Sequence, residues 1–169
     1  MEVQMNPQME MVKKNAYRVA SYYFDVTKTL ECGQCFRWQK TGDSYVGVVA
    51  QSVIVIGPLD DDHHMVTIYG NEMTYAEIAH YFDLETDYEH IFDQLSTIDD
   101  HMNNAAAYGK GIRILNQEPF ETLLSFIISS NNNIPKIRMT VEALSEKFGK
   151  YLGHFQGKQI GRASCRERV

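Results

Sequence analysis

The chain reads Ser125-Phe-Ile-Ile-Ser-Ser-Asn-Asn-Asn-Ile-Pro-Lys-Ile-Arg138 where one apolar helical segment ends and another begins. Asparagine is a poor helix former that favours caps and turns, because its side chain competes for nearby backbone groups. Three in a row predict a helix–helix junction rich in amide donors and acceptors. Taken alone, the run is best explained as a turn in which the amides cap the second helix and bond the end of the first.

Both flanking segments have helical periodicity. Before the asparagines, apolar residues at i, i+3, i+4, i+7 and i+8 predict one buried stripe, made of Phe120, Leu123, Leu124, Ile127 and Ile128. Pro119 falls in the first turn of this helix, where a missing N–H costs nothing. After the asparagines a second stripe consists of Ile134, Ile137, Val141, Leu144 and Phe148, with Gly149 just past its end. Further helices are expected at 75–82, 88–95 and 99–108.

The first half of the chain has the pattern of short strands. Runs rich in aromatic and β-branched residues, separated by turn residues, predict strands at 35–39, 45–50, 52–56 and 65–69. Gly57-Pro58 is expected to close the third strand, and 60–64 to form a polar loop. The spacing indicates an antiparallel meander. With the helices that follow, the sequence predicts an α+β fold.

Composition limits the classes of protein. The chain has 169 residues, of which 44% are hydrophobic, so it is long enough to bury a core. Its apolar stretches are too short to span a bilayer, and the polar start from Met1 to Lys14 lacks the apolar core of a secretory signal. Three cysteines, an odd number, suit a reducing compartment. We therefore expect a cytoplasmic protein with no membrane partner, associated with the nucleoid if the source is prokaryotic.

The net charge of −6 is unevenly distributed. Residues 51–109 contain twelve acidic and no Lys or Arg side chains, whereas residues 110–159 contain seven basic and four acidic ones. A partner that carries phosphates would approach the C-terminal part. A solvated acidic face explains the middle of the chain equally well.

Cys32-Gly-Gln-Cys35 has the spacing of metal and redox sites. A structural zinc site needs four ligands, and the chain has no second CxxC pair. His63-His64 lies in an acidic stretch without the spacing of a known site. No metal and no cofactor are therefore expected. Gly33 either permits close approach of a ligand to the backbone or simply makes a turn.

Four motifs in order resemble the N-terminal half of 8-oxoguanine DNA glycosylases. They are Gly33-Gln-Cys-Phe-Arg-Trp38, Tyr81-Phe-Asp-Leu84, Gly111-Ile-Arg-Ile-Leu with Gln117-Glu-Pro, and Ser125-Phe-Ile-Ile-Ser-Ser-Asn-Asn-Asn-Ile134. The resemblance spans about residues 24–157. It implies an antiparallel, TATA-binding-protein-like sheet with helices at 1–115, followed at 116–159 by the first helices of a helix-hairpin-helix glycosylase domain.

The resemblance also implies a partner and roles. The expected partner is double-stranded DNA containing 8-oxoguanine, bound by a monomer that flips the damaged base out of the stack. The glycine matching Gly33 offers its carbonyl to the N7–H that distinguishes 8-oxoguanine from guanine. The residue matching Asn131 fills the gap in the stack and bonds the orphaned cytosine, and Asn132 and Asn133 are expected to lie at the DNA with it. Lys136 stands where an arginine usually reads that cytosine, and lysine lacks the planar bidentate fork.

The residues that carry the family's chemistry have no match here. The resemblance implies a lysine that attacks the sugar and an assisting aspartate, at or after a Leu-Pro-Gly-Val-Gly-x-Lys hairpin. The sequence contains no such motif, so no catalytic residue is assigned and the chain is expected to be inactive alone. Residues 160–169 resemble one reading frame of a sequencing-library adapter and are expected to be a non-native tail. The helices around Ile127 and Val141 should then lack part of their cover.

Two other functions remain open from the sequence. One is an alkylated-base glycosylase acting on 3-methyladenine, which shares the two-domain plan. The other is a non-catalytic module in which the sheet and the asparagine junction bind a nucleic acid or a protein, which predicts cooperative folding of residues 1–159.

Overall fold

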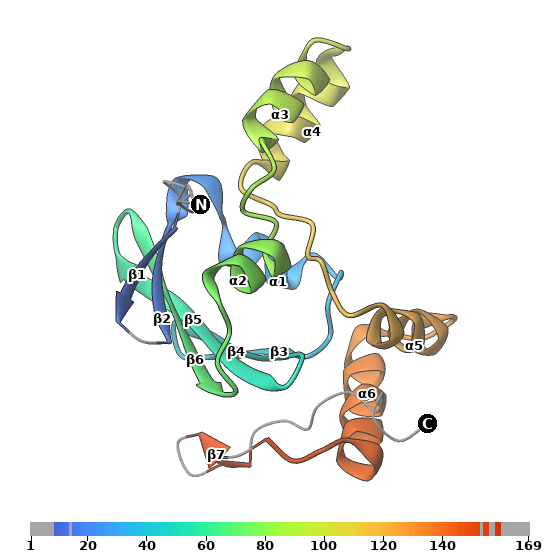
Figure 1. Cartoon of the computed structure of the whole chain (residues 1–169). Coiled ribbons are helices and arrows are strands. Elements are labelled where there is room, and N and C mark those ends of the chain that lie inside the picture. The colour runs from blue at the N-terminus through green and yellow to red at the C-terminus, as the bar shows by residue number, and fades with distance from the viewer. Residues whose placement is uncertain (1–8, 14, 153, 156–157, 160–169) are drawn as a thin grey trace.

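The computed structural model describes residues 9–13, 15–152, 154–155 and 158–159. Its centre is a six-stranded antiparallel sheet in the order β1-β2-β6-β5-β4-β3 (Figure 1). The strands are β1 (Met9–Lys13), β2 (Ala16–Ala20), β3 (Trp38–Thr41), β4 (Ser44–Val49), β5 (Ser52–Asp60) and β6 (His63–Gly70). Two helices, α1 (Val26–Glu31) and α2 (Tyr75–Tyr81), lie across one face of the sheet. The predicted α+β class is confirmed.

The predicted meander is confirmed for β3 to β6, which pair in chain order. Three predictions there are wrong. The strand expected to end at Ile56 continues as β5 to Asp60, because it still pairs with β6 there, with Pro58 opposite His64. Pairing with β4 ends at Ile56, so Pro58 has a neighbouring strand on one side only, as a proline in a sheet usually does. The expected loop at 60–64 is a tight turn at Asp61 and Asp62, with both histidines in β6. The strand predicted from residue 35 begins only at Trp38.

Four elements of the first half were not predicted from the sequence. Strands β1 and β2 form a hairpin, and β2 pairs with β6 rather than with the next strand in the chain. Between β2 and β3 the chain forms a 3-10 turn, η1 (Ser21–Tyr23), and then α1. The helix α1 is capped by Asp25, whose carboxylate accepts the Lys28 N–H at 2.9 Å.

One hydrophobic core fills the space between the sheet and the two covering helices. Strand residues Val19, Ile54, Ile56 and Val66 are fully buried against helix and loop residues such as Phe82. Burial of side chains of this size contributes roughly 1.5–3 kcal/mol each. The Trp38 indole N–H donates to the Tyr81 hydroxyl at 2.9 Å, which ties β3 to α2 inside this core. The sheet, α1 and α2 therefore form one packed unit.

A helical hairpin stands away from the sheet (Figure 1). It consists of α3 (Tyr88–Ser96) and α4 (Asp100–Gly109), both predicted from periodicity. Arg113 anchors its base. The guanidinium is buried, donates to the Asp83 and Thr86 carbonyl oxygens at 3.1 and 2.9 Å, and lies 4.5 Å from the centre of the Tyr88 ring.

The last two long helices, α5 (Pro119–Ser129) and α6 (Ile134–Phe148), lie beside the sheet (Figure 1). The predicted burial of the α5 stripe is wrong, since Leu123 is 54% and Ile127 59% exposed. The stripe of α6 is buried at Ile137 and Val141. The expected lack of part of the cover is thus confirmed around Ile127, and it also holds for the stripe around Val141, where Ile134 and Phe148 are exposed. Apolar spacing marks a helix face but not what covers it.

Two short strands, β7 (His154–Phe155) and β8 (Lys158–Gln159), pair with each other.

The expected non-native tail at 160–169 lies outside the described residues, and the domain boundaries stay predictions. In the part of the chain that the structure describes, no helix is long and apolar enough to cross a membrane.

Candidate functional site

The three asparagines between α5 and α6 do different things. The Asn132 side chain donates from Nδ2 to the Ile128 carbonyl oxygen at 3.2 Å, which satisfies an acceptor at the end of α5. The Asn133 Oδ1 accepts the Lys136 backbone N–H at 3.0 Å and caps the start of α6. Two of the three amides therefore form the satisfied turn that local sequence predicts.

Asn131 is different. Its φ is 55°, in the left-handed region that asparagine enters more readily than other residues with a side chain. Asn131 is exposed, and its side chain takes part in no hydrogen bond among the described residues. The turn therefore holds one amide away from the local network, on the outside of the junction. Lys136, in the first turn of α6, is exposed as well.

Gly33 lies in the connection between α1 and β3. Its φ is 93°, which side chains rarely allow, and a Cβ placed there would meet nothing within 4 Å. The residue is exposed. The positive φ thus makes a turn, and the open space around it leaves the backbone accessible to a ligand.

Gln34 fastens this connection to the segment that leads into α5. Its Nε2 donates to the carbonyl oxygens of Thr29 and Arg113, both at 2.8 Å. Its Oε1 accepts the Leu115 N–H at 2.9 Å, and its own carbonyl oxygen accepts from Gln117 Nε2 at 2.7 Å. The glycine loop and the start of α5 are therefore parts of one hydrogen-bonded unit.

A second link lies next to the first. The Arg37 Nη1 is 3.0 Å from the Glu121 Oε2, and the two side chains are 9% and 22% exposed. The start of α5 is capped by Glu118, whose carboxylate accepts the Glu121 N–H at 2.7 Å. Both links connect the residues around Gly33 to the helix that ends at the asparagines.

The two cysteines of the CxxC motif are free thiols, with Cys32 exposed and Cys35 buried. Burial raises the pKa of Cys35 to about 12, so the thiolate that redox and metal chemistry needs is scarce near neutral pH. Among the described residues, no group of three or more His, Cys, Asp or Glu side chains is placed to hold a metal ion.

On α6, the Arg138 Nε is buried without a hydrogen-bond partner in the described structure.

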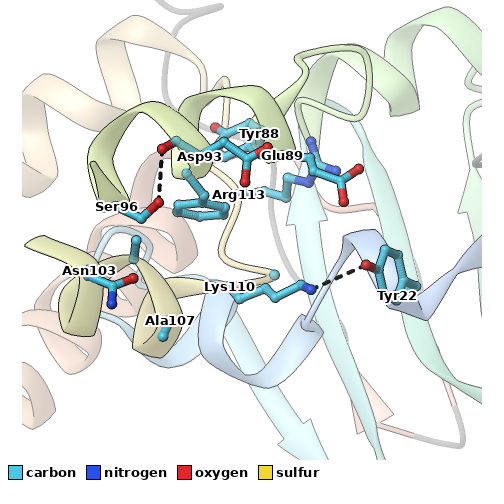
Figure 2. Close-up of a pocket in the computed structure, with 12 residues that line it drawn as sticks. Tyr22, Tyr88, Glu89, Asp93, Ser96, Asn103, Ala107, Lys110 and Arg113 are labelled. Carbon is cyan, nitrogen blue, oxygen red and sulfur yellow. Dashed lines mark hydrogen bonds between the residues drawn. The ribbon is translucent and has the colours of Figure 1, made fainter. Parts of the chain in front are cut away.

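A pocket of about 230 Å³ lies elsewhere, between η1 and the α3–α4 hairpin (Figure 2). Lys110 crosses it to donate to the Tyr22 hydroxyl at 3.2 Å and lies 4.7 Å from the centre of that ring. Neither Gly33 nor any residue of the asparagine run lines this pocket. It is separate from the candidate site.

Sequence reasoning missed the residues that connect the two halves of the site. Gln34 and Arg37 stand inside a motif of which only Gly33 received a role, and their partners Gln117 and Glu121 lie more than eighty residues further along the chain. A polar Gln and an Arg embedded among Phe36, Trp38 and other apolar residues are the only local signal. Such residues are usually paired when buried.

Comparison with known proteins gives a consistent result. Residues 16–123 match the family model described as the N-terminal domain of 8-oxoguanine DNA glycosylase. The chain is 32% identical over 145 residues to the N-glycosylase/DNA lyase of Saccharomyces cerevisiae, covering 78% of this chain and 38% of that protein. It is 31% identical over 146 residues to the N-glycosylase/DNA lyase OGG1 of Arabidopsis thaliana, covering 83% of this chain and 40% of that one.

Among solved structures, the chain is similar to the 8-oxoguanine glycosylase/lyase of Clostridium acetobutylicum in complex with double-stranded DNA containing cytosine opposite 8-oxoguanine. The TM-score is 0.78 at 32% identity, over 92% of this chain and 54% of that one. The chain spans about two fifths of the length of the curated relatives it matches.

Proposed function

Because this chain belongs to the 8-oxoguanine DNA glycosylase family, we propose that it carries the DNA-recognition part of a base-excision repair enzyme that removes 8-oxoguanine from duplex DNA. The observation that supports this best is the conformation of Asn131. Asn132 and Asn133 satisfy the helix ends, while Asn131 is exposed and its amide makes no hydrogen bond in the part of the chain that the structure describes.

The proposed role of Asn131 is to occupy the space left when a base is flipped out and to bond the cytosine that loses its partner. Flipping costs a few kcal/mol of stacking and pairing, and an amide has both a donor and an acceptor with which to replace lost base-pair hydrogen bonds. Lys136 is exposed in the adjoining helical turn, where its charge suits a phosphate or the cytosine. Its single ammonium gives weaker selection for cytosine than a bidentate arginine would.

The proposed role of Gly33 is to read the damaged base. A backbone carbonyl attracts the N7–H of 8-oxoguanine and repels the N7 lone pair of guanine, so one acceptor distinguishes the two. The open space around Gly33 supports approach of a planar base to the backbone.

We propose that removal of the base and cleavage of the strand require residues that this sequence does not contain. Its 169 residues include no Leu-Pro-Gly-Val-Gly-x-Lys hairpin. The exposed apolar side chains of α5, including Phe126 at 71%, support a division in which 116–159 begins a helical domain that further helices cover. Action as a monomer and a location in the cytoplasm, at the nucleoid in a prokaryote, are part of the same proposal.

Fluorescence anisotropy of this chain with short duplexes tests recognition. We expect tighter binding to 8-oxoguanine opposite cytosine than to guanine opposite cytosine. The variant Asn131→Gly keeps the left-handed backbone and should weaken binding to the damaged duplex about tenfold. Asn15→Gly is the matched control, because Asn15 also has a positive φ of 61° but lies in the β1–β2 hairpin.

Equal affinity for the damaged and undamaged duplexes, or a stronger preference for alkylated adenine, would overturn the proposal. Borohydride reduction of the chain with the damaged duplex should trap no covalent adduct. A trapped adduct would show that a lysine of this chain is a nucleophile.

A further inference from the structure

We propose that Gln34 is a positioning residue, which fixes the carbonyl group of Gly33 in the orientation that distinguishes 8-oxoguanine from guanine. This inference rests on the proposed function of Gly33. It assigns discrimination between the bases to a side chain that need not touch DNA.

The side-chain amide of Gln34 uses all of its donors. Two carbonyl oxygens, those of Thr29 and Arg113, receive the two Nε2–H groups, while Oε1 accepts the Leu115 N–H. Since a carbonyl only accepts and an N–H only donates, these partners fix which end of the amide is oxygen. All three partners are backbone groups, so the amide is held by the fold itself and not by mobile side chains.

Gly33 has no comparable restraint of its own. A glycine at a φ of 93° with nothing within 4 Å of its Cβ position has neither a side chain nor close packing to hold its peptide plane. The carbonyl of Gly33 belongs to the peptide that joins it to Gln34. The next residue, Gln34, is fixed both through its side chain and through its carbonyl, which accepts from Gln117 at 2.7 Å.

Placement of this carbonyl decides selectivity because a hydrogen bond weakens steeply with angle. A misplaced carbonyl both attracts the N7–H less and repels the guanine N7 less. Affinity for DNA in general comes from phosphate contacts with Lys and Arg, and Gln34 is uncharged with its amide bonded to the backbone of this chain. Loss of Gln34 should therefore lower the ratio of affinities for damaged and undamaged duplex and leave binding to the undamaged duplex nearly unchanged.

The test uses two variants and one control in this 169-residue chain. Gln34→Leu removes all three side-chain bonds. Gln34→Glu keeps the shape and the acceptor for Leu115 but cannot donate to Thr29 or Arg113. Gln39→Leu is the matched control, because Gln39 is an exposed glutamine in β3 whose side chain makes no hydrogen bond in the described part of the chain.

Two measurements are made on each protein. Hydrogen exchange of the backbone amides reports on the loop, and we expect faster exchange at Leu115 and at residues 32–36 in Gln34→Leu, a smaller increase in Gln34→Glu, and none in Gln39→Leu. Anisotropy gives the ratio of affinities for 8-oxoguanine and guanine duplexes. It should fall about fivefold in Gln34→Leu, less in Gln34→Glu, and not at all in Gln39→Leu.

The outcomes separate this inference from the function on which it rests. If the unaltered chain prefers damaged DNA and Gln34→Leu keeps the same ratio, or exchanges no faster in the loop, Gln34 does not position Gly33. If Gln34→Leu lowers affinity for both duplexes equally, its role is structural only, which also overturns the proposal. If the unaltered chain shows no preference, the proposed function fails and takes the inference with it. A folding defect in Gln34→Leu leaves the decision to Gln34→Glu.

Discussion

The Arg37 guanidinium and the Glu121 carboxylate lie 3.0 Å apart (Nη1 to Oε2) in a site where both side chains are mostly buried. Burial raises the pKa of Glu121 above its ordinary value, although Arg37 acts to lower it. Desolvation therefore outweighs the pairing. Between the ordinary pKa of glutamate and the raised one, the folded state holds a proton that the unfolded state has released, so this group's contribution to stability falls as pH rises through that window.

Arg37→Gln should destabilise the chain by about 2 kcal/mol near pH 7.5, because it leaves a buried carboxylate without its cation. The loss should be smaller near pH 5, because the absence of Arg37 raises the pKa of Glu121 further and a larger share of this carboxyl then carries a proton. Urea unfolding at both pH values measures this, with Arg37→Gln combined with Glu121→Gln as the control that removes both charges. An equal loss at the two pH values would contradict the expected role of Glu121.

His64 predicts a pH dependence of the opposite sign. Its Nε2 donates to the Phe24 carbonyl oxygen at 3.2 Å, and its Nδ1 is buried without a hydrogen-bond partner in the described structure. Burial lowers the pKa of His64, an effect that His63 reinforces and that Asp25 and the Phe24 carbonyl oppose. The stability due to neutral His64 is fully present above the ordinary histidine pKa and is lost progressively as pH falls from there to the lowered pKa of the folded state, because only the unfolded state takes up the proton in that window.

The free energy of unfolding should accordingly decrease between about pH 7.5 and pH 5.5, and His64→Phe should flatten this slope. His63→Gln is the matched control. The His63 ring is paired with Asp60 at 2.7 Å on the exposed hairpin turn. Burial is the largest cause of the lowered His64 pKa and His63 a smaller one, so removal of His63 should leave most of the slope due to His64 in place. A slope that persists unchanged in His64→Phe would assign the pH dependence to another group.

The parts of the fold that local sequence predicted are those set by neighbouring residues. Helices α3 and α4 begin at the caps Asp87 and Asp99, and α5 has Pro119 in its first turn, all visible in the sequence. The extension of β5 through Pro58 follows its pairing with β6, which no local pattern records.

The site was predictable to the same extent. The hydrogen bonds of Asn132 and Asn133 to the helix ends are those expected of asparagine at a helix junction. The positive φ of Asn131 is likewise a conformation that asparagine adopts readily. The clamp of Gln34 on the Arg113 and Leu115 backbone joins segments far apart in the chain, and the exposure of Ile127 reflects missing neighbours. Both depend on tertiary contacts that periodicity does not contain.

Two glycines with similar backbones should respond differently to substitution. Gly33 and Gly111 have φ of 93° and 88°, but a Cβ at Gly111 would lie 2.8 Å from the Asp25 Cβ and 3.1 Å from the Asp25 nitrogen. Gly33→Ala should cost about 1–2 kcal/mol from backbone strain alone. Gly111→Ala should cost roughly 3 kcal/mol or more, because the backbone around Asp25 must also move. Equal losses in urea unfolding would contradict the steric difference.

The asparagine run should separate stability from binding, one residue at a time. Asn133→Ala removes the cap of α6, whose Oδ1 accepts the Lys136 N–H, and should cost about 1 kcal/mol. Asn131→Gly removes no hydrogen bond among the described residues and relieves a positive φ, so unfolding should change by less than about 0.5 kcal/mol or become harder. Urea unfolding of the two variants at one pH decides between these roles. If Asn131→Gly is the more destabilised protein, the amide of Asn131 stabilises the fold, which contradicts its proposed role in binding DNA.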